Sequence, residues 1–353
     1  MNSRDAVWSE QGTTPDAIEA AVRQLLLDVH VEDESFVPAR VLNMIAFVDR
    51  EWSGEIANRL RGVGRYHASR MVVLAYEPRR ERLDARVMIA AEGEPRRGEL
   101  ALLHETVVVE LGDRHLDDLL TIADPLVVTD LPTLLWSPHG HHEIVDELLG
   151  LAQAILLDSV EEPSAREALD RACMLSGQAY VVDLAWLRTT PWRERLAASF
   201  DPPALRPQLR RVSALTVRHH PASTAAAMLL AGWLASRLDW GVESLVEHGD
   251  SLLGNAHASH QDVAIRLQAA PELQVPGLEG VTIETAAGRS LSLDRGPGGL
   301  RARSRTGEAA EREWTIPGAS RGETGVLGEG IRQALLRDPT YVPALGAARA
   351  LVP

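Results

Sequence analysis

The sequence predicts an α/β protein of two domains, and three observations carry this prediction. In the first half of the chain, apolar runs typical of buried strands alternate with amphipathic helical patterns. The second half opens with helical patterns and ends with short strand-like segments that glycine and proline separate. The length of 353 residues also exceeds what one hydrophobic core usually serves. We therefore expect a mixed-sheet α/β layer domain over residues 1–160 and a domain of helices followed by a small sheet over residues 161–353.

The first half is expected to contain five strands, because five apolar runs have the length and character of strands. They cover residues 39–48, 70–76, 84–91, 101–111 and 153–157. A helix is expected after Thr14 and Pro15, which suit the N-cap and the first helical position, since Ile18 and Val22 then recur on one face. Further helices are expected over residues 54–66, 115–122 and 142–149.

The second half is expected to begin at Glu161-Glu162-Pro163, where acidic residues and a proline fit the first turn of a helix. Helices are expected over residues 167–174, 183–200, 223–240 and 325–336, and strands over residues 212–218, 264–269, 281–285, 290–294 and 300–304. Residues 295–299 (RGPGG) predict a hairpin loop. In the helix at 223–240, Gly232 predicts the close approach of another element, and Trp233 is expected in the core.

Composition excludes several functional classes. A formal net charge of -14 would repel phosphate backbones, so we expect no nucleic-acid partner. No apolar run approaches the ~20 residues that span a bilayer, and residues 1–11 lack the apolar region of a signal peptide, so we expect no membrane contact. The one cysteine, Cys173, lies in an apolar helical pattern and allows neither an intrachain disulfide nor a thiolate-rich zinc site. We therefore expect a cytoplasmic protein.

A search for catalytic groups finds little. All 36 basic residues are arginine, so neither a Walker A lysine nor a Schiff-base lysine is available. Gly62-Val63-Gly64 begins like a dinucleotide loop, but His67 replaces the third glycine and the segment follows a helical pattern. We therefore expect no cofactor.

The most metal-like segment is His139-Gly140-His141-His142-Glu143. Adjacent histidines in a loop can bind a divalent ion, but zinc sites need spaced ligands that a second layer of residues holds in place. The alternative is a solvated turn that caps the helix beginning near Glu143. We favour the turn and expect no metal.

Aromatic and charged residues are densest at residues 183–194 (DLAWLRTTPWRE). Thr190 can cap a helix, Pro191 suits its first position, and Trp192 begins an apolar stripe that continues at Leu196. Two interpretations stand side by side. The segment is either a pair of helices packed by two tryptophans or a partner surface, since tryptophan and arginine are enriched in interface hot spots.

Residues 183–194 resemble the D-L-x-W-x-R-x-T-P-W-R-E block of the OpcA family of glucose-6-phosphate dehydrogenase assembly proteins. Three further segments are similar to blocks of that family in the same order: residues 39–43 (ARVLN), 130–136 (DLPTLLW) and 229–240 (LLAGWLASRLDW). Two positions depart from the family pattern, because Ala68 replaces a proline and Ser137 replaces a tryptophan.

The resemblance implies a two-domain α/β protein that is not itself an enzyme. It implies an assembly factor or allosteric activator that binds glucose-6-phosphate dehydrogenase in the oxidative pentose phosphate pathway. The alternative is a sugar-phosphate-binding enzyme or sensor, because Arg70 and Arg188 could grip a phosphate. The candidate partner-binding residues are Trp186, Arg188, Arg193, Asp183, Arg70 and Trp136.

Overall fold

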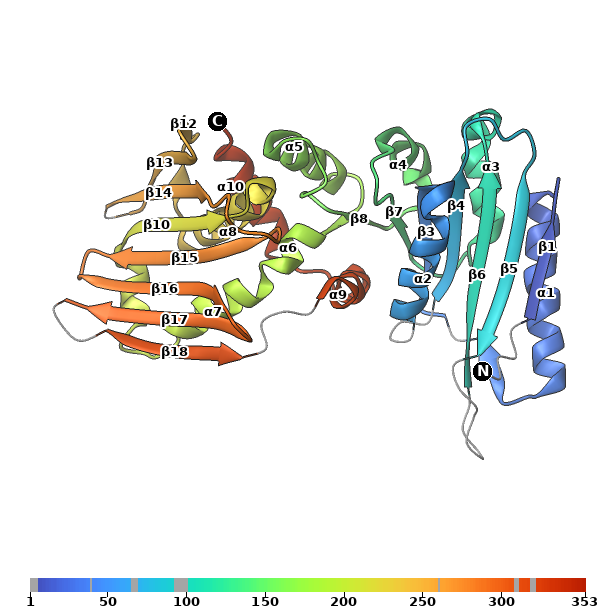
Figure 1. Cartoon of the computed structure of the whole chain (residues 1–353), viewed down its shortest axis with the longest axis horizontal. Coiled ribbons are helices and arrows are strands. Elements are labelled where there is room, and N and C mark those ends of the chain that lie inside the picture. The colour runs from blue at the N-terminus through green and yellow to red at the C-terminus, as the bar shows by residue number, and fades with distance from the viewer. Residues whose placement is uncertain are drawn as a thin grey trace. The chain divides into compact units, whose positions relative to one another are not determined.

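The computed structural model describes residues 6–38, 40–64, 69–91, 101–259, 261–307, 311–317 and 322–353. The chain forms two compact units, and each has its own mixed sheet of nine strands among these residues (Figure 1). The first unit comprises Met1–Leu157, Gln178–Val182 and Leu327–Leu336. The second comprises Asp158–Gly177, Asp183–Val326 and Arg337–Pro353. Two separate mixed sheets with helices confirm the predicted α/β class.

The sheet of the first unit has a parallel centre and an antiparallel edge. Its strands follow the order β1-β5-β6-β4-β3-β7-β8-β9, with β2 beside β6. The strands are β1 (Ala6–Glu10), β2 (Phe36–Pro38), β3 (Leu42–Asp49), β4 (Ser69–Tyr76), β5 (Asp84–Ala91), β6 (Ala101–Leu111), β7 (Thr133–Trp136), β8 (Ala154–Leu157) and β9 (Tyr180–Asp183). Neighbours run parallel from β6 through β4, β3 and β7 to β8, whereas β5 pairs antiparallel with both β6 and β1. Strands β3 and β4 are buried at every position but the last, as expected for apolar runs covered on both faces.

Among the described residues, four helices lie wholly in this unit: α1 (Pro15–Glu32), α2 (Ser53–Gly64), α3 (Leu119–Ala123) and α4 (His142–Leu148). Helix α1 begins as predicted, because the Thr14 hydroxyl accepts a hydrogen bond from the Ala17 amide and Pro15 occupies the first turn. The expected helix at 115–122 is instead a 3₁₀ segment, η2 (Asp113–Asp118), followed by the short α3. Shorter 3₁₀ turns are η1 (Arg50–Trp52), η3 (Asp124–Leu126) and η4 (Leu149–Leu151).

The sheet of the second unit is larger than the small sheet that the sequence predicted. Its order is β11-β13-β14-β10-β15-β16-β17-β18, with β12 beside β13. The strands are β10 (Val212–His219), β11 (Gly241–Val242), β12 (Val246–His248), β13 (Ser251–His257), β14 (Asp262–Ala269), β15 (Leu278–Thr285), β16 (Arg289–Gly296), β17 (Gly299–Thr306) and β18 (Arg312–Pro317). Strand β10 precedes the main helix yet lies inside this sheet, parallel to β14 and antiparallel to β15.

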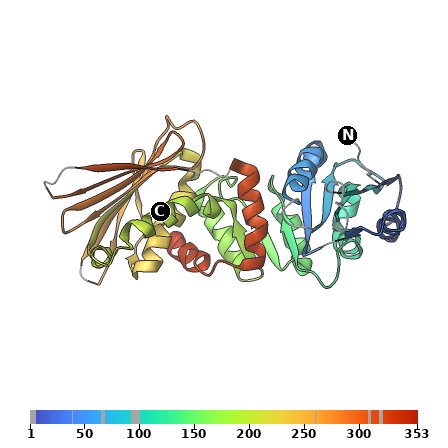
Figure 2. The same ribbon diagram turned by 90° about the horizontal axis from the view of Figure 1, so that it is seen from below.

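One face of this sheet is covered by helices (Figure 2). Along β14, buried Val263, Ile265 and Leu267 alternate with exposed residues, which is the pattern of a one-sided sheet. The helices are α5 (Ala165–Ser176), α6 (Leu184–Arg188), α7 (Thr190–Phe200), α8 (Thr224–Leu238) and α10 (Tyr341–Ala350), with 3₁₀ turns η5 (Arg206–Arg211) and η6 (Pro221–Ser223). Helix α9 (Gly322–Leu336) contributes residues to both units. Among the described residues, no helix combines the length and the apolar character needed to cross a bilayer.

Helices α8 and α10 pack closely through Gly232. A Cβ atom at Gly232 would lie within 2.6 Å of the Ala348 amide nitrogen and closer still to the Ala344 carbonyl oxygen, so only glycine fits. This confirms the predicted close approach. The prediction that Trp233 is a core residue was wrong, because its side chain is half-buried. Leu230 and Leu234 provide the buried stripe of α8, and Trp233 lies on its flank.

Candidate functional site

The segment at 183–194 comprises the end of β9, helix α6 and the start of α7. Asp183 caps α6, because its Oδ1 accepts a hydrogen bond of 2.9 Å from the Ala185 amide. Pro191 lies in the first turn of α7 as predicted, but Thr189 occupies the N-cap position that was expected for Thr190. The Thr190 hydroxyl instead accepts a hydrogen bond of 2.9 Å from Arg193 Nη2.

Asp183 is fully buried and connects several segments of the second unit by hydrogen bonds. Ser159 donates to its carboxylate from the hydroxyl at 2.6 Å and from the amide at 3.2 Å, and the Tyr341 hydroxyl donates at 3.3 Å. Burial, together with the nearby Asp158 carboxylate, raises the pKa of Asp183 to about 6, although the hydrogen bonds from Ser159 and Ala185 lower it. Asp183 therefore holds three segments together and presents no surface to a partner.

Trp186 and Arg193 form a buried stack. The guanidinium carbon of Arg193 lies 3.5 Å from the Trp186 ring centroid, and Trp186 Nε1 donates to Asp338 Oδ2 at 3.0 Å. Burial lowers the pKa of Arg193 to about 10. Burial would raise the pKa of Asp338, but hydrogen bonds from Thr340 and Trp186 and the charge of Arg193 hold that pKa below its usual value.

Arg188 reaches the surface of the second unit. Its side chain is 22% exposed, and its Nη1 lies 2.8 Å from Asp158 Oδ1 and 2.7 Å from Oδ2. Arg188 also lines a mainly apolar cavity of about 250 Å³, together with Thr189 and Val275. The Val275 side chain is 60% exposed. This cavity is the place where the segment offers both an arginine and an apolar surface.

Arg70 and Trp136 lie in the interior of the first unit. Arg70 Nε donates to Glu105 Oε2 at 2.7 Å, and its Nη1 donates to the Leu126 carbonyl at 3.3 Å. Arg40 pairs with the same Glu105 carboxylate. Trp136 ends β7 and is only 4% exposed. Buried charged groups are normally paired, and Arg70 and Glu105 are paired here.

Five of the six candidate residues are therefore buried, and the expectation that the segment exposes Trp186 and Arg193 was wrong. The physical reason is that tryptophan beside arginine is favoured both in interface hot spots and in buried cation–π stacks. Whether these residues influence partner binding stays a prediction. Arg188 is the candidate whose position suits direct contact.

A second candidate site lies at the carboxyl ends of the parallel strands of the first unit. The chain proceeds from β3 through β4 to β6 on one side, and then places β7 and β8 on the other side of β3. Open α/β sheets bind ligands outside the carboxyl ends of their strands, at such a switch point. These strand ends could not be brought together from the sequence, because strand order is not visible there.

Aromatic rings and carboxylates fill this edge. The His141 ring packs against Phe47 at 5.0 Å and Tyr76 at 6.0 Å between ring centroids, and its Nε2 lies 3.2 Å from Asp49 Oδ1. The Tyr76 hydroxyl donates to the Asp113 carboxylate, and this bond is the main reason why the pKa of Tyr76 is raised to about 12.

The histidine loop after β7 contributes to the same edge. His141 has a φ of 58° and occupies the N-cap position of α4, but its side chain caps no backbone amide, so the expected capping interaction is not formed. The His139 ring lies 5.4 Å from the ring of Trp52, which is 41% exposed. In the part of the chain that the structure describes, no group of three or more histidine, cysteine or acidic residues is arranged to bind a metal.

The turn between β3 and α2 lacks the features of a phosphate loop. It contains Asp49, Glu51 and Trp52 where a dinucleotide-binding turn places glycines. Gly62-Val63-Gly64 forms the last turn of α2, and residues 65–68, which include His67 and Ala68, lie outside the described residues. Cys173 is half-buried, and burial raises the pKa of its thiol, which is the opposite of an activated nucleophile.

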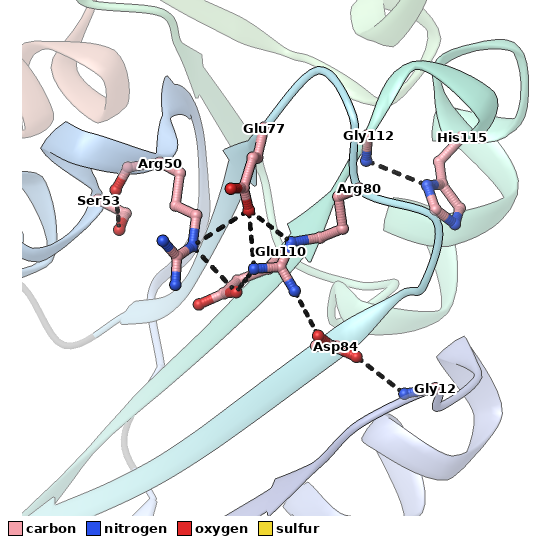
Figure 3. A network of polar contacts seen from close by, with 9 residues as sticks. All are labelled: Gly12, Arg50, Ser53, Glu77, Arg80, Asp84, Glu110, Gly112 and His115. Carbon is pink, nitrogen blue, oxygen red and sulfur yellow. Dashed lines mark hydrogen bonds and ion pairs between the residues drawn. The ribbon is translucent and has the colours of Figure 1, made fainter.

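A polar network holds the neighbouring turns in place (Figure 3). Arg80 pairs with Asp84, Glu110 and Glu77, the last at 2.9 Å, and Arg50 Nε lies 3.2 Å from Glu110 Oε2. The hydrogen bond to Glu110 is the main reason why the pKa of Arg50 is raised. The network joins the turn after β4 to the end of β6 and the start of η1. Its two guanidinium groups are both engaged with its three carboxylates, so the network fixes this edge of the sheet.

Comparison with known families decides the assignment. The model of the glucose-6-phosphate dehydrogenase subunit N-terminal domain matches residues 61–173, and the model of the C-terminal domain of the same subunit matches residues 179–345. The chain belongs to the OpcA family. The N-terminal match ends within α5, and the C-terminal match begins just before β9 and contains the segment at 183–194.

Curated OpcA proteins are similar over part of the chain. The OxPP cycle protein OpcA of Synechococcus elongatus is 29% identical over 141 residues, which cover 38% of this chain and 32% of that protein. The OxPP cycle protein OpcA of Nostoc punctiforme is 30% identical over 143 residues, which cover 39% of this chain and 30% of that protein. The aligned part thus spans about a third of the length of these OpcA relatives.

Among solved structures, an oxidoreductase from Sinorhizobium meliloti is similar to this OpcA chain with a TM-score of 0.51. It covers 89% of this chain and 96% of its own, at 12% sequence identity. This similarity concerns the fold alone.

Proposed function

We propose that this chain is a non-catalytic partner of glucose-6-phosphate dehydrogenase, whose assembly or activity it promotes in the oxidative pentose phosphate pathway of the cytoplasm. The family models carry the name of a subunit of that enzyme, and the relatives are named for the OxPP cycle. An allosteric activator must bind one state of the enzyme more tightly than another. A coupling of about 1–3 kcal/mol changes substrate affinity between roughly fivefold and a hundredfold.

The observation that carries the non-catalytic part is the turn between β3 and α2. Asp49, Glu51 and Trp52 stand there in place of glycines that would let a backbone approach a pyrophosphate. A carboxylate in this turn would repel a pyrophosphate. Two like unit charges 4 Å apart repel by about 1 kcal/mol in water and about 4 kcal/mol near a protein surface. The N-terminus of a helix offsets this repulsion with only about half a positive charge. These magnitudes favour a role without a nicotinamide cofactor.

The rings at the same edge support this proposal. Phe47, Tyr76 and His141 pack on one another at the ends of neighbouring strands, so protein side chains occupy part of the switch point. A fold that resembles an oxidoreductase is compatible with this, because function depends on the site and not on the fold.

Two measurements test the proposal. Calorimetry of the isolated chain with NADP⁺ and with NAD⁺ is expected to give no binding up to about 1 mM, a limit that corresponds to about -4 kcal/mol. Titration of the chain into the dehydrogenase of the same host is expected to form a complex and to raise kcat/KM, with the dehydrogenase alone as control. Micromolar binding of either nucleotide contradicts the non-catalytic part, and the absence of a complex contradicts the partner.

The alternative of a sugar-phosphate enzyme or sensor rested on Arg70 and Arg188. Arg70 is buried and paired with Glu105, and Arg188 is paired with Asp158. Either arginine would have to leave a carboxylate to hold a phosphate, which costs more when the pair is buried. The geometry therefore favours the partner protein.

A further inference from the structure

The second unit contains a cavity of about 710 Å³, within the usual size range of small-molecule sites. It lies between the first turns of α5 and α8, the ends of β10 and β14, and the hairpin that joins β12 to β13. Met228, Leu252 and Leu267 provide apolar walls. Neither the segment at 183–194 nor the strand ends of the first unit contribute to it.

His219 at the end of β10 gives this cavity a buried polar group. The residue is 2% exposed, lines the cavity, and places its Nδ1 2.9 Å from the His220 carbonyl oxygen. A carbonyl oxygen only accepts, so the hydrogen of the ring is on Nδ1. Burial lowers the pKa of His219, which keeps the ring neutral and leaves Nε2 as an acceptor. Nε2 forms no hydrogen bond with the residues that the structure describes, and because His219 lines the cavity, Nε2 can accept a hydrogen bond from a ligand there.

The charges around the cavity disfavour an anionic ligand. Glu162, Glu247 and Asp250 line it, against the single guanidinium of Arg166. The first turns of α5 and α8 add about half a positive charge each, so about one negative charge remains. A phosphate or carboxylate would be repelled. A cation would satisfy the carboxylates but would leave the hydroxyl donor of Ser251 without a partner, whereas the Thr224 hydroxyl already donates to the Pro221 carbonyl at 3.1 Å.

An uncharged polyhydroxyl compound matches this lining. Each hydroxyl group both donates and accepts, so it can bond with the Glu247 and Asp250 carboxylates, with His219 Nε2 and with the hydroxyl of Ser251. The carbon skeleton can lie on the apolar walls. We propose that this cavity binds a neutral polyol of about hexose size, with His219 Nε2 and the Glu247 carboxylate as acceptors for its hydroxyl groups.

Calorimetry of the isolated full chain tests the site without the dehydrogenase, so its result is independent of the proposed function. The probes are glucose and myo-inositol as neutral polyols, glucose 6-phosphate as the anionic counterpart, and spermidine as a cation. At least one neutral polyol is expected to bind with a Kd of about 1 mM or tighter. Glucose 6-phosphate and spermidine are expected to bind more weakly than that polyol. No binding of either polyol, or preferred binding of either charged probe, overturns the proposal.

Two variants locate the site. His219→Asn can keep the donor to the His220 carbonyl but leaves no acceptor at the position of Nε2, and Glu247→Gln removes the exposed carboxylate. Each is expected to weaken polyol binding about tenfold, the effect of one good hydrogen bond. Glu272→Gln, an exposed position outside the cavity, is the matched control and is expected to bind like the parent. If His219→Asn does not fold, as judged by thermal melting, Glu247→Gln decides alone. Parent-like affinity in the folded variants overturns the proposal.

Discussion

The Arg193 guanidinium lies over the Trp186 ring, with its carbon 3.5 Å from the ring centroid, and both side chains share Asp338 as a polar partner. Trp186 donates to Asp338 Oδ2 at 3.0 Å, and Arg193 Nη1 lies 3.7 Å from the same oxygen. The stack therefore contributes to the interior of the second unit. We expect its loss to lower the free energy of unfolding more directly than it weakens partner binding.

Arg193→Ala is expected to lower the free energy of unfolding by about 2–4 kcal/mol, because a desolvated cation–π contact and a buried charge pair are lost together. Arg193→Lys should recover little of this loss, since an ammonium group cannot stack as a planar guanidinium does. Urea unfolding measures both. Arg237→Ala, at an exposed position of α8, is the control and should change stability by less than about 0.5 kcal/mol. A parent-like value for Arg193→Ala would show that the stack carries no net stability.

The raised pKa of Asp183 predicts that the stability of the chain depends on pH. The pKa of its carboxyl is raised to about 6 in the folded chain, from an ordinary value of 3.8. Between these two values the folded state binds more protons than the unfolded state, so Asp183 lowers stability as the pH rises from about 4 to about 6. Two pKa units correspond to about 3 kcal/mol, of which we expect roughly 2 kcal/mol to be seen.

The comparison is with Asp183→Asn, which cannot titrate. Urea unfolding of both chains at pH 4.5 and at pH 7 should show the parent losing about 2 kcal/mol relative to the variant at the higher pH. Other titrating groups cancel in this difference because both chains contain them. A difference that is the same at the two pH values would mean that the buried carboxyl has an ordinary pKa.

Gly232→Ala is expected to destabilise the chain by about 2–3 kcal/mol, because the added methyl group collides with the backbone of α10 at Ala344 and Ala348. Gly346→Ala is a matched control within α10, since a Cβ at Gly346 meets no atom within 4 Å. The control should stabilise the helix by up to about 1 kcal/mol. Thermal melting of the two variants measures the contrast, and equal shifts would rule out a tight α8–α10 contact.

Arg188 carries the prediction about the partner surface. Arg188→Ala is expected to weaken binding to the dehydrogenase by about 30-fold, the effect of a hot spot of about 2 kcal/mol. Because Asp158 would lose its partner, Arg188→Lys serves as a second variant that keeps the charge and loses the two-pronged geometry. Each chain is titrated against the dehydrogenase after its melting temperature is checked. If both variants are folded and bind like the parent, the interface lies elsewhere.

The elements with strong periodicity could be predicted from the sequence. The expected strands at 84–91 and 101–111 coincide with β5 and β6, and each of these strands is paired on both sides within the sheet. Strands β13 and β18 were missed because their positions are mostly half-buried or exposed, which erases the alternation that marks a strand. Helix α10 was missed because Pro343 and Gly346 disfavour a helix locally, although tertiary packing supports one.

The candidate segment could be located from the sequence, but whether its side chains face the surface or the interior could not. The motif residues at 183–194 were recognised, yet the fate of Trp186 depends on Asp338, which lies 152 positions further along the chain. The switch point of the first unit depends on strand order, and no local pattern records that β3 lies between β4 and β7. Residue type therefore selected the candidate groups, and only tertiary structure shows that most of them face inward.

The distance between Asp183 and Tyr341 along the chain has a consequence for synthesis in the cell. The two residues are 158 positions apart, and ribosomes add about 5–20 residues each second. The segment at 183–194 must therefore wait on the order of 10–30 s after it is made before Asp338 and Tyr341 exist. During that interval Trp186 and the Asp183 carboxyl are without these partners. Until those residues are made, the segment at 183–194 lacks two of the contacts that bury it in the finished fold.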